Sequence, residues 1–430
     1  MFGVFYLPSS IVKMKQSKYN ILIREAQRNY IYNTCSLALA EIEDENIELL
    51  GTPQLLPEDT AKLLFRAGYL VDDNDNELDA LIARNRISRF SGNILGLVIA
   101  PTLNCNLKCT YCFEEKRNSN MTENIIQNLV TFVNEKISQE NISEVNVTWY
   151  GGEPLLGYKG IKRISKELQK ICRDNKLRYT AGIITNGVLL DAEKALEIRK
   201  DFNITWAQIT LDGPKEIHEK RRCSVNGEES FEQIIENIKN CIDVIDINLR
   251  INIDKDNKEY VIELLDELNR TTWFNKVKLN FAKVKGVRGK EYSQEEFADI
   301  EFELWNYMVQ NQMRSFEEYE QVKIDTACAS IGTNYYVIDP EGLLYTCWNE
   351  IGIKERSIGS LGALPNYNSN YTQWLLQEYS KKCKECIYLP LCQGGCPYEV
   401  IRNKENCCSI QALNLNRYIK KRIEIYNREN

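Results

Sequence analysis

Histidine is almost missing from this sequence: His218 is the only one among 430 residues. Histidine-rich metal sites and mechanisms that need two histidines are therefore excluded. Every apolar run is shorter than the ~20 residues that a helix needs to span a bilayer. The first residues, MFGVFYLPSSIVKMKQ, have no basic segment ahead of an apolar stretch. We therefore expect no secretory signal and no membrane partner.

The sequence also lacks an excess of basic charge. Its formal net charge is −7, which argues against a nucleic-acid backbone as the main partner, since phosphate binding requires clustered cations. These absences together predict a cytoplasmic globular protein.

Cysteine, in contrast, is abundant, with 15 residues in the chain. Eight of them lie between Cys328 and Cys408, where an even scatter would place about three, and three more lie between Cys105 and Cys112. Because disulfides are rare in cytosolic chains, this clustering favours metal ligation or redox chemistry.

The middle of the chain alternates between strand-like and helix-like segments. Six strand-like runs are expected at residues 95–101, 145–150, 179–185, 206–211, 247–253 and 277–284, with amphipathic segments such as 124–137 between them. This alternation predicts a parallel sheet with right-handed crossovers, an α/β fold of the partial (β/α)6 TIM-like barrel type.

Unusual residues follow these strands directly. The first strand leads into NCNLKCTYC, the second into GGEP, the third ends in TNG, the fourth in LDGP and the fifth in NID. Barrel enzymes place their active sites at the carboxyl ends of the strands. We therefore expect these five segments to converge at one mouth.

We expect four parts along the chain. Residues 1–90 form a small α+β module of winged-helix type, residues 91–290 the barrel, residues 291–325 a helical connector, and residues 326–430 a cysteine-rich domain that ends in a helix.

The first cysteine motif is Cys105-x3-Cys109-x2-Cys112. Three thiolates on one short loop can hold three irons of a [4Fe–4S] cluster and leave the fourth iron open for a substrate. The alternative is a zinc knuckle, but zinc requires a fourth Cys or His, and none stands in this loop.

The second cysteine set has similarly short spacings. It consists of Cys328, Cys347, Cys383, Cys386, Cys392, Cys396, Cys407 and Cys408. This many thiolates can hold two clusters, and a Cys-only zinc ribbon is the alternative.

The motif Cys105-x3-Cys109-x2-Cys112, with Tyr111 before its third cysteine, resembles the signature of radical S-adenosylmethionine (radical SAM) enzymes. GGEP resembles the family segment that binds the amine of SAM. TNG and TLDGPKEIHEKRR are similar to further family segments, the second commonly written SxDGxxxxHDxxR, in which Thr210 here replaces Ser and Glu219 replaces Asp. The C-terminal cysteines resemble the SPASM pattern, which carries two auxiliary [4Fe–4S] clusters.

This resemblance implies three [4Fe–4S] clusters, SAM as cofactor, and an electron donor such as flavodoxin or ferredoxin. SAM cleavage would give a 5′-deoxyadenosyl radical that abstracts hydrogen from a substrate. The implied SAM contacts are Tyr111, Gly151, Gly152, Glu153, Thr185, Asn186, Thr210, Asp212 and Arg222. No individual catalytic residue is assigned.

The SPASM resemblance also implies which cysteines belong together. The outer cluster would use Cys383, Cys386, Cys392 and either Cys407 or Cys408, and the inner cluster Cys328, Cys347 and Cys396. No further cysteine stands near Cys328. The inner cluster would therefore have an open iron, or the spare member of the Cys407–Cys408 pair would complete it.

Enzymes with this pattern mostly modify peptides. The resemblance implies a maturase that forms cysteine thioether links in a ribosomally made precursor, with the leader peptide bound by the module of residues 1–90 through strand addition. The alternatives are carbon–carbon crosslinking and formylglycine formation of the sulfatase-maturase type. In that last group an Asp usually follows the cysteine equivalent to Cys347, whereas Trp348 stands here.

Overall fold

The computed structural model describes residues 13–287, 289–319, 327–363, 367–404 and 407–429. The chain divides into two compact units. The barrel unit consists of residues 90–318 and 328–377, and the terminal unit of residues 1–89, 319–327 and 378–430. The expected domain of residues 326–430 therefore contributes to both units, and the expected functional boundaries stay a prediction.

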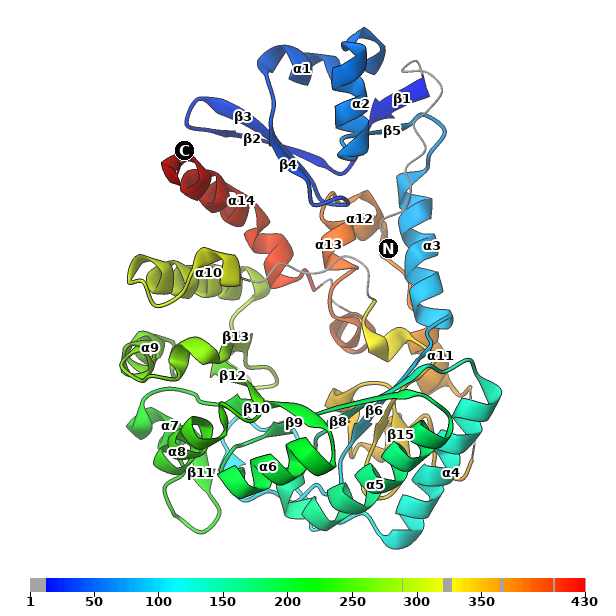
Figure 1. Cartoon of the computed structure of the whole chain (residues 1–430), viewed down its shortest axis with the longest axis vertical. Coiled ribbons are helices and arrows are strands. Elements are labelled where there is room, and N and C mark those ends of the chain that lie inside the picture. The colour runs from blue at the N-terminus through cyan, green and yellow to red at the C-terminus, as the bar shows by residue number, and fades with distance from the viewer. Residues whose placement is uncertain (1–12, 288, 320–326, 364–366, 405–406, 430) are drawn as a thin grey trace. The chain divides into compact units, whose positions relative to one another are not determined.

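The barrel unit is built on six parallel strands, at the positions expected from the sequence (Figure 1). They are β6 (Ile94–Ile99), β8 (Glu144–Trp149), β9 (Arg178–Thr185), β10 (Ile204–Thr210), β12 (Asp246–Ile253) and β13 (Lys278–Lys283). They lie in the sheet in chain order, which confirms the α/β fold with a mostly parallel sheet.

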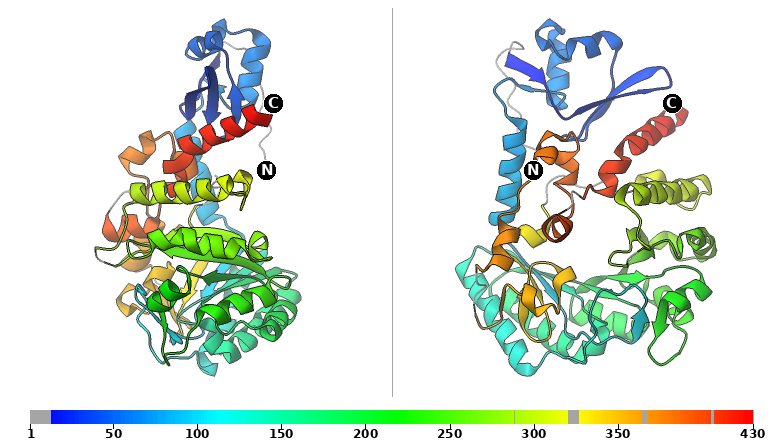
Figure 2. Two further views of the ribbon diagram at one scale, coloured as in Figure 1. Left: turned by 90° about the vertical axis from the view of Figure 1, so that its left-hand side faces the viewer. Right: turned by 180° about the vertical axis from the view of Figure 1, so that it is seen from behind.

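Helices connect these strands and lie along the same face of the sheet, since each crossover to the next parallel strand is right-handed (Figure 2). They are α4 (Glu123–Gln139), α5 (Tyr158–Asp174), α6 (Ala192–Asp201), α7 (Lys215–Arg221), α8 (Phe231–Cys241) and α9 (Val261–Asn269). The strands bury apolar side chains on both faces, for example Leu97 and Val98 of β6, as parallel sheets do.

The sheet continues beyond the six strands. After α10 (Gln294–Gln310), strand β14 (Tyr335–Ile338) pairs in parallel with β6, and β15 (Leu343–Tyr345) and β16 (Gly359–Ser360) follow antiparallel. Helix α11 (Ser369–Leu375) ends this unit. The first part of the expected cysteine-rich region is therefore continuous with the barrel sheet. Residues 320–325 of the expected connector lie outside the described residues.

The terminal unit contains small sheets and helices from both ends of the chain. Its elements are β1 (Met14–Gln16), β2 (Asn20–Glu25), β3 (Arg28–Asn33), β4 (Leu39–Glu41), α1 (Asp44–Leu49), α2 (Glu58–Arg66), β5 (Leu70–Asp72), α3 (Glu77–Phe90), α12 (Lys381–Glu385), α13 (Leu389–Cys392) and α14 (Ile410–Glu429). Strands β2, β3 and β4 form one antiparallel sheet, and β1 pairs with β5. Its assignment to the winged-helix type stays a prediction.

Among the described residues, no helix combines the length and the apolar character that a bilayer crossing requires.

Candidate active site

The loop after β6 carries the first three cysteines and is held by a second segment. Within it, β7 (Leu107–Cys109) pairs antiparallel with β11 (Arg222–Ser224), and this pairing sets Cys109 opposite Arg222. The ammonium of Lys116 also donates to the carbonyl of Leu107. The cysteine loop is therefore held by residues from the run that follows the fourth barrel strand.

Of the three cysteines in this loop, Cys105 and Cys109 are half-buried and Cys112 is exposed. Burial raises the pKa of Cys105 to about 11 and also raises the pKa of Cys112, while the charge of Lys116 opposes both shifts. A metal would have to displace these thiol protons, because the thiolate is the ligand.

The donor set of three cysteines fits a [4Fe–4S] cluster with one open iron. Among the described residues, no three His, Cys, Asp or Glu side chains converge as the ligands of a single metal ion do. The fit therefore rests on the chemistry and spacing of the donors.

Gly151 and Gly152 allow the GGEP segment to pack against the start of the cysteine loop. Gly151 has a φ of +104°, and a Cβ atom there would lie 2.4 Å from the carbonyl oxygen of Thr102. A Cβ on Gly152 would lie 2.4 Å from the carbonyl oxygen of Asn104, which also accepts a hydrogen bond from the Glu153 amide at 2.8 Å. These glycines thus serve the approach of one loop to another, and their contact with SAM stays a prediction.

The Glu153 side chain is fully buried and joins two loops. Its carboxylate accepts hydrogen bonds from the Thr185 hydroxyl and the backbone N–H of Asn186, each at 2.8 Å, and from the backbone N–H of Leu155 at 3.0 Å. Burial raises the pKa of Glu153, and these donors oppose the shift. The Asn186 side chain in turn donates to the side-chain oxygen of Asn106 at 2.7 Å, so TNG, GGEP and the cysteine loop form one connected network.

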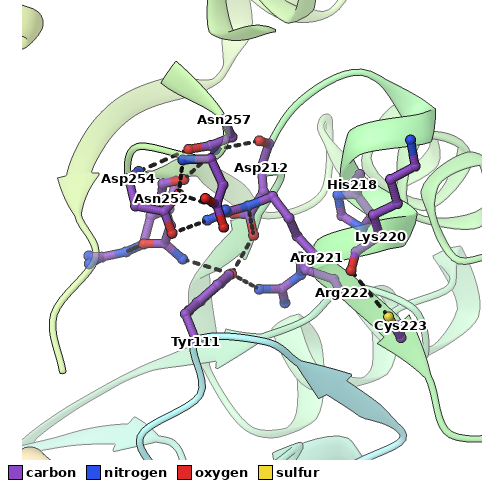
Figure 3. A network of polar contacts seen from close by, with 12 residues as sticks. Tyr111, Asp212, His218, Lys220, Arg221, Arg222, Cys223, Asn252, Asp254 and Asn257 are labelled. Carbon is purple, nitrogen blue, oxygen red and sulfur yellow. Dashed lines mark hydrogen bonds and ion pairs between the residues drawn. The ribbon is translucent and has the colours of Figure 1, made fainter. Parts of the chain in front are cut away.

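Tyr111 is the centre of a second buried network, drawn in Figure 3. Its hydroxyl donates to Oδ2 of Asp212 at 2.5 Å and accepts hydrogen bonds from Nη1 of Arg222 at 2.7 Å and from Nδ2 of Asn252 at 3.2 Å. Burial raises the pKa of both Tyr111 and Asp212, and the charge of Arg222 opposes each shift. The structure thus joins Tyr111, Asp212 and Arg222, three of the residues expected to contact SAM.

The network extends to residues that were not expected from the sequence. Arg221 makes a bidentate pair with Asp254, at 2.7 and 3.0 Å, and its Nε lies 3.7 Å from Oδ2 of Asp212 (Figure 3). Asn257 donates to the backbone carbonyls of Asp212 and Asn252. Asp254 closes the NID segment after the fifth strand, so the position of that segment was the available signal.

The other residues of the fourth-strand segment have structural contacts. Thr210 is buried at the end of β10. Glu219 accepts hydrogen bonds from the amides of Ser230, at 2.7 Å, and Phe231, at 2.6 Å, at the start of α8, where a carboxylate is stabilised by the helix dipole. His218 is fully buried, and burial lowers its pKa well below the usual value, so a structural role as a neutral side chain agrees with its setting.

The second cysteine set is found in both units. In the barrel unit, burial raises the pKa of Tyr335, and electrostatic interactions with the thiols of Cys328 and Cys347 raise it further. In the terminal unit, burial raises the pKa of Cys408, and three neighbouring thiols raise it further: Cys392, Cys386 and Cys383.

The Cys408 thiol is therefore near enough to the three cysteines expected to bind the outer cluster for their charges to act on it. The next amide, that of Ser409, donates to Sγ of Cys392 at 3.4 Å. Cys407 is buried, and its backbone carbonyl packs closely against Gly395. Cys396 is part of the same terminal unit and is partly exposed.

The model of the Radical SAM superfamily matches residues 99–268, the segment that contains both buried networks and the first three cysteines. The chain contains a radical SAM domain. The superfamily predicted from the cysteine motif is thus confirmed, and membership implies a [4Fe–4S] cluster and SAM.

Two known proteins resemble most of the radical SAM chain. The cysteine-type anaerobic sulfatase-maturating enzyme of Clostridium novyi is 28% identical over 72% of this chain and 89% of its own. The structure of native anSMEcpe with bound AdoMet has a TM-score of 0.60 and 19% identity, over 78% of this chain and 100% of its own.

The match to a second structure covers more of the chain. Streptococcus suis SuiB bound to precursor peptide SuiA has a TM-score of 0.53 and 18% identity, over 93% of this chain and 99% of its own. At such identities these structural matches establish the fold alone.

Proposed function

We propose that this enzyme is a peptide maturase that forms thioether links between a cysteine sulfur and a carbon atom of a ribosomally made precursor. The observation that supports a peptide substrate is the share of this chain that matches a structure solved with its precursor peptide. SuiB, solved with its precursor peptide, resembles 93% of this chain, whereas the sulfatase-maturase structure resembles 78%. Because a match over 93% of the chain includes most of residues 1–90, we infer that this module binds a leader peptide.

The first cluster would be held by Cys105, Cys109 and Cys112, and its open iron would take SAM. When bound, the cluster and SAM supply one electron and a 5′-deoxyadenosyl radical, while the protein contributes binding and orientation. Glu153 fixes the loops around this position through its three hydrogen bonds. The buried Arg222 presents a positive charge beside Cys109, which suits the carboxylate of SAM.

Two auxiliary clusters complete the proposal. We assign Cys383, Cys386, Cys392 and Cys408 to the outer one, because the Cys408 thiol lies near the other three. Cys328, Cys347 and Cys396 would hold the inner one, which would either keep an open iron or take Cys407 as its fourth ligand. The iron contents of the Cys408→Ala and Cys407→Ala variants test whether Cys408 is a ligand of the outer cluster and Cys407 a ligand of the inner one. A small electron-transfer protein such as flavodoxin or ferredoxin would supply the reducing electron.

Formylglycine formation is the second candidate, because the relative from Clostridium novyi is a sulfatase-maturating enzyme. Trp348 counts against it. This residue follows Cys347, where sulfatase maturases usually carry an Asp that acts as a base, and an indole cannot accept a proton from a substrate thiol. Carbon–carbon crosslinking on the same scaffold stays a further alternative.

Mass spectrometry of the peptide encoded beside the gene, after anaerobic co-expression with the enzyme, tests the proposal. Thioether formation removes two hydrogens per link and leaves iodoacetamide no free thiol to alkylate. A loss of sulfur would indicate formylglycine made from cysteine. A loss of two hydrogens with all thiols still free would indicate formylglycine made from serine if a hydrazide reagent labels a new aldehyde, and a carbon–carbon link if it does not. An unchanged peptide would refute the proposal, provided that the Cys105→Ala control is also inactive and the wild type cleaves SAM.

A further inference from the structure

Tyr150 and Trp348 form a stacked aromatic pair in the barrel unit. Their ring centroids lie 5.8 Å apart with an angle of 26° between the planes. Tyr150 immediately precedes Gly151, and Trp348 immediately follows Cys347. The pair therefore connects the GGEP segment, which packs on the first cysteine loop, with the loop that carries Cys347.

Trp348 is unusually accessible for a residue of this size. It is 40% exposed although Tyr150 lies against one of its faces. Tryptophan is highly buried on average, and exposed aromatic rings with one supported face are frequent anchors for a partner. The exposed part of the indole is thus available to a ligand.

Glu114 interacts with the Tyr150 side chain and has a buried carboxylate oxygen without a hydrogen-bond partner in the described part of the chain. Its carboxyl group and the Tyr150 hydroxyl are hydrogen-bonded. The Oε2 atom of Glu114 is buried and takes part in no hydrogen bond among the described residues. Because a buried acceptor without a donor is unfavourable, this atom is satisfied when a ligand brings an N–H group to it.

Arg250 of β12 adds hydrogen-bond donors to the same region. Its Nε donates to Oδ1 of Asn252 at 2.8 Å, and its terminal nitrogens donate no hydrogen bond within the part of the chain that the structure describes. Its charge acts on Tyr111 and on Tyr150. Arg250 is thus joined to the Tyr111 network through Asn252, and its charge reaches Tyr150 of the aromatic pair.

We propose that Trp348, Arg250 and Glu114 form the subsite that holds the reacting segment of the peptide substrate. The exposed indole of Trp348 packs against an apolar or sulfur-containing side chain, since thiols and thioethers make favourable contacts with aromatic rings. Arg250 donates to a backbone carbonyl, and Glu114 accepts from a backbone N–H. This inference rests on the proposed function, because it takes a peptide as the substrate.

The test compares Trp348→Ala with Trp348→Phe, which keeps an aromatic face. Tyr367→Ala is the matched control, because Tyr367 is 73% exposed and stacks on Tyr371, at 5.7 Å and 17°, in the same unit. Each variant is first checked for iron content and for SAM cleavage without peptide, which report on the folding of the cysteine loop.

With the precursor peptide, we expect Trp348→Ala to raise the peptide KM by about tenfold, the loss typical of one anchoring aromatic. The ratio of crosslinked peptide to 5′-deoxyadenosine should fall as well. Trp348→Phe should recover most of both quantities, and Tyr367→Ala should match the wild type. A wild-type peptide KM in Trp348→Ala, an equal effect in Tyr367→Ala, or a raised KM for SAM without peptide would overturn the proposal.

Binding of a fluorescently labelled precursor peptide separates this inference from the proposed function. If the wild type forms no crosslink but binds the peptide more tightly than Trp348→Ala does, the thioether function fails and the subsite stands. If crosslinks form and Trp348→Ala binds and reacts like the wild type, the function stands and the subsite is refuted.

Discussion

At the scale of single residues, the site is defined by buried polar groups that hold each other. Glu153 accepts three hydrogen bonds, and the Tyr111 hydroxyl makes the three that a phenol can make, one donated and two accepted. Because an unsatisfied buried polar atom is costly, each of these groups fixes the position of its partners. The loops around the cysteines are therefore positioned before any ligand binds.

Glu153→Gln should destabilise the barrel unit. The amide nitrogen of Gln cannot accept from Thr185 or Asn186, so one buried donor loses its partner at a cost of about 1–3 kcal/mol. Anaerobic denaturant unfolding should show a lower midpoint. Glu123→Gln is the control, since that carboxylate is 63% exposed and pairs with Arg163 at the surface. Equal stability of the two variants would contradict the role of Glu153 as a connecting group.

At the scale of elements, close contacts between loops decide where the cysteines lie. The GGEP segment packs onto the backbone of residues 102–104, and β11 pairs with β7 inside the cysteine loop. In both contacts, the two segments that meet lie far apart in the sequence. The geometry of the three thiols therefore depends on the strands that place these loops side by side.

Gly152→Ala should displace the cysteine loop. The new Cβ would lie 2.4 Å from the carbonyl oxygen of Asn104 and 2.7 Å from that of Leu103, closer than van der Waals contact allows. We expect iron binding and SAM cleavage to fall together while the auxiliary cysteines still bind iron. Gly51→Ala, with nothing within 4 Å of the added atom, should keep full iron content, and the same retention in Gly152→Ala would disprove this account.

At the scale of the whole molecule, the two ends of the chain belong to one compact unit. Tyr19, Leu81 and Leu389 form a buried cluster, and Cys383 packs against it. The Thr34 hydroxyl donates to the carbonyl of Ile387 at 2.6 Å. The module of residues 1–90 is thus packed on the segment that carries the expected outer-cluster ligands.

Leu81→Ala should therefore affect both ends of the chain and leave the barrel unit unchanged. Removing this buried side chain creates a cavity and should cost about 2–5 kcal/mol. Amide hydrogen exchange should accelerate in the first 90 residues and around residues 381–392, with SAM cleavage retained. Leu63→Ala, at a position that is 64% exposed, should have little effect. Faster exchange throughout the barrel strands would show that the two units do not unfold separately.

The sequence alone determined the six barrel strands, the segments at their carboxyl ends and the cysteine loop. These follow from local spacing and from the alternation of apolar and polar residues, which the chain carries wherever it folds. The same local signals predicted a small α+β module over residues 1–90. They missed β7 and β11, because a strand of three residues is too short to show an alternation of apolar and polar residues.

Only the tertiary structure decided which distant groups meet. It directed the Glu153 carboxylate towards Thr185 and Asn186, paired Arg221 with Asp254, and placed the Cys408 thiol near those of Cys383, Cys386 and Cys392. Cys407 and Cys408 differ by only one residue in their spacing from any partner, so the sequence leaves the choice between them open. Contacts between groups far apart in the chain depend on how the loops pack, which local spacing does not specify.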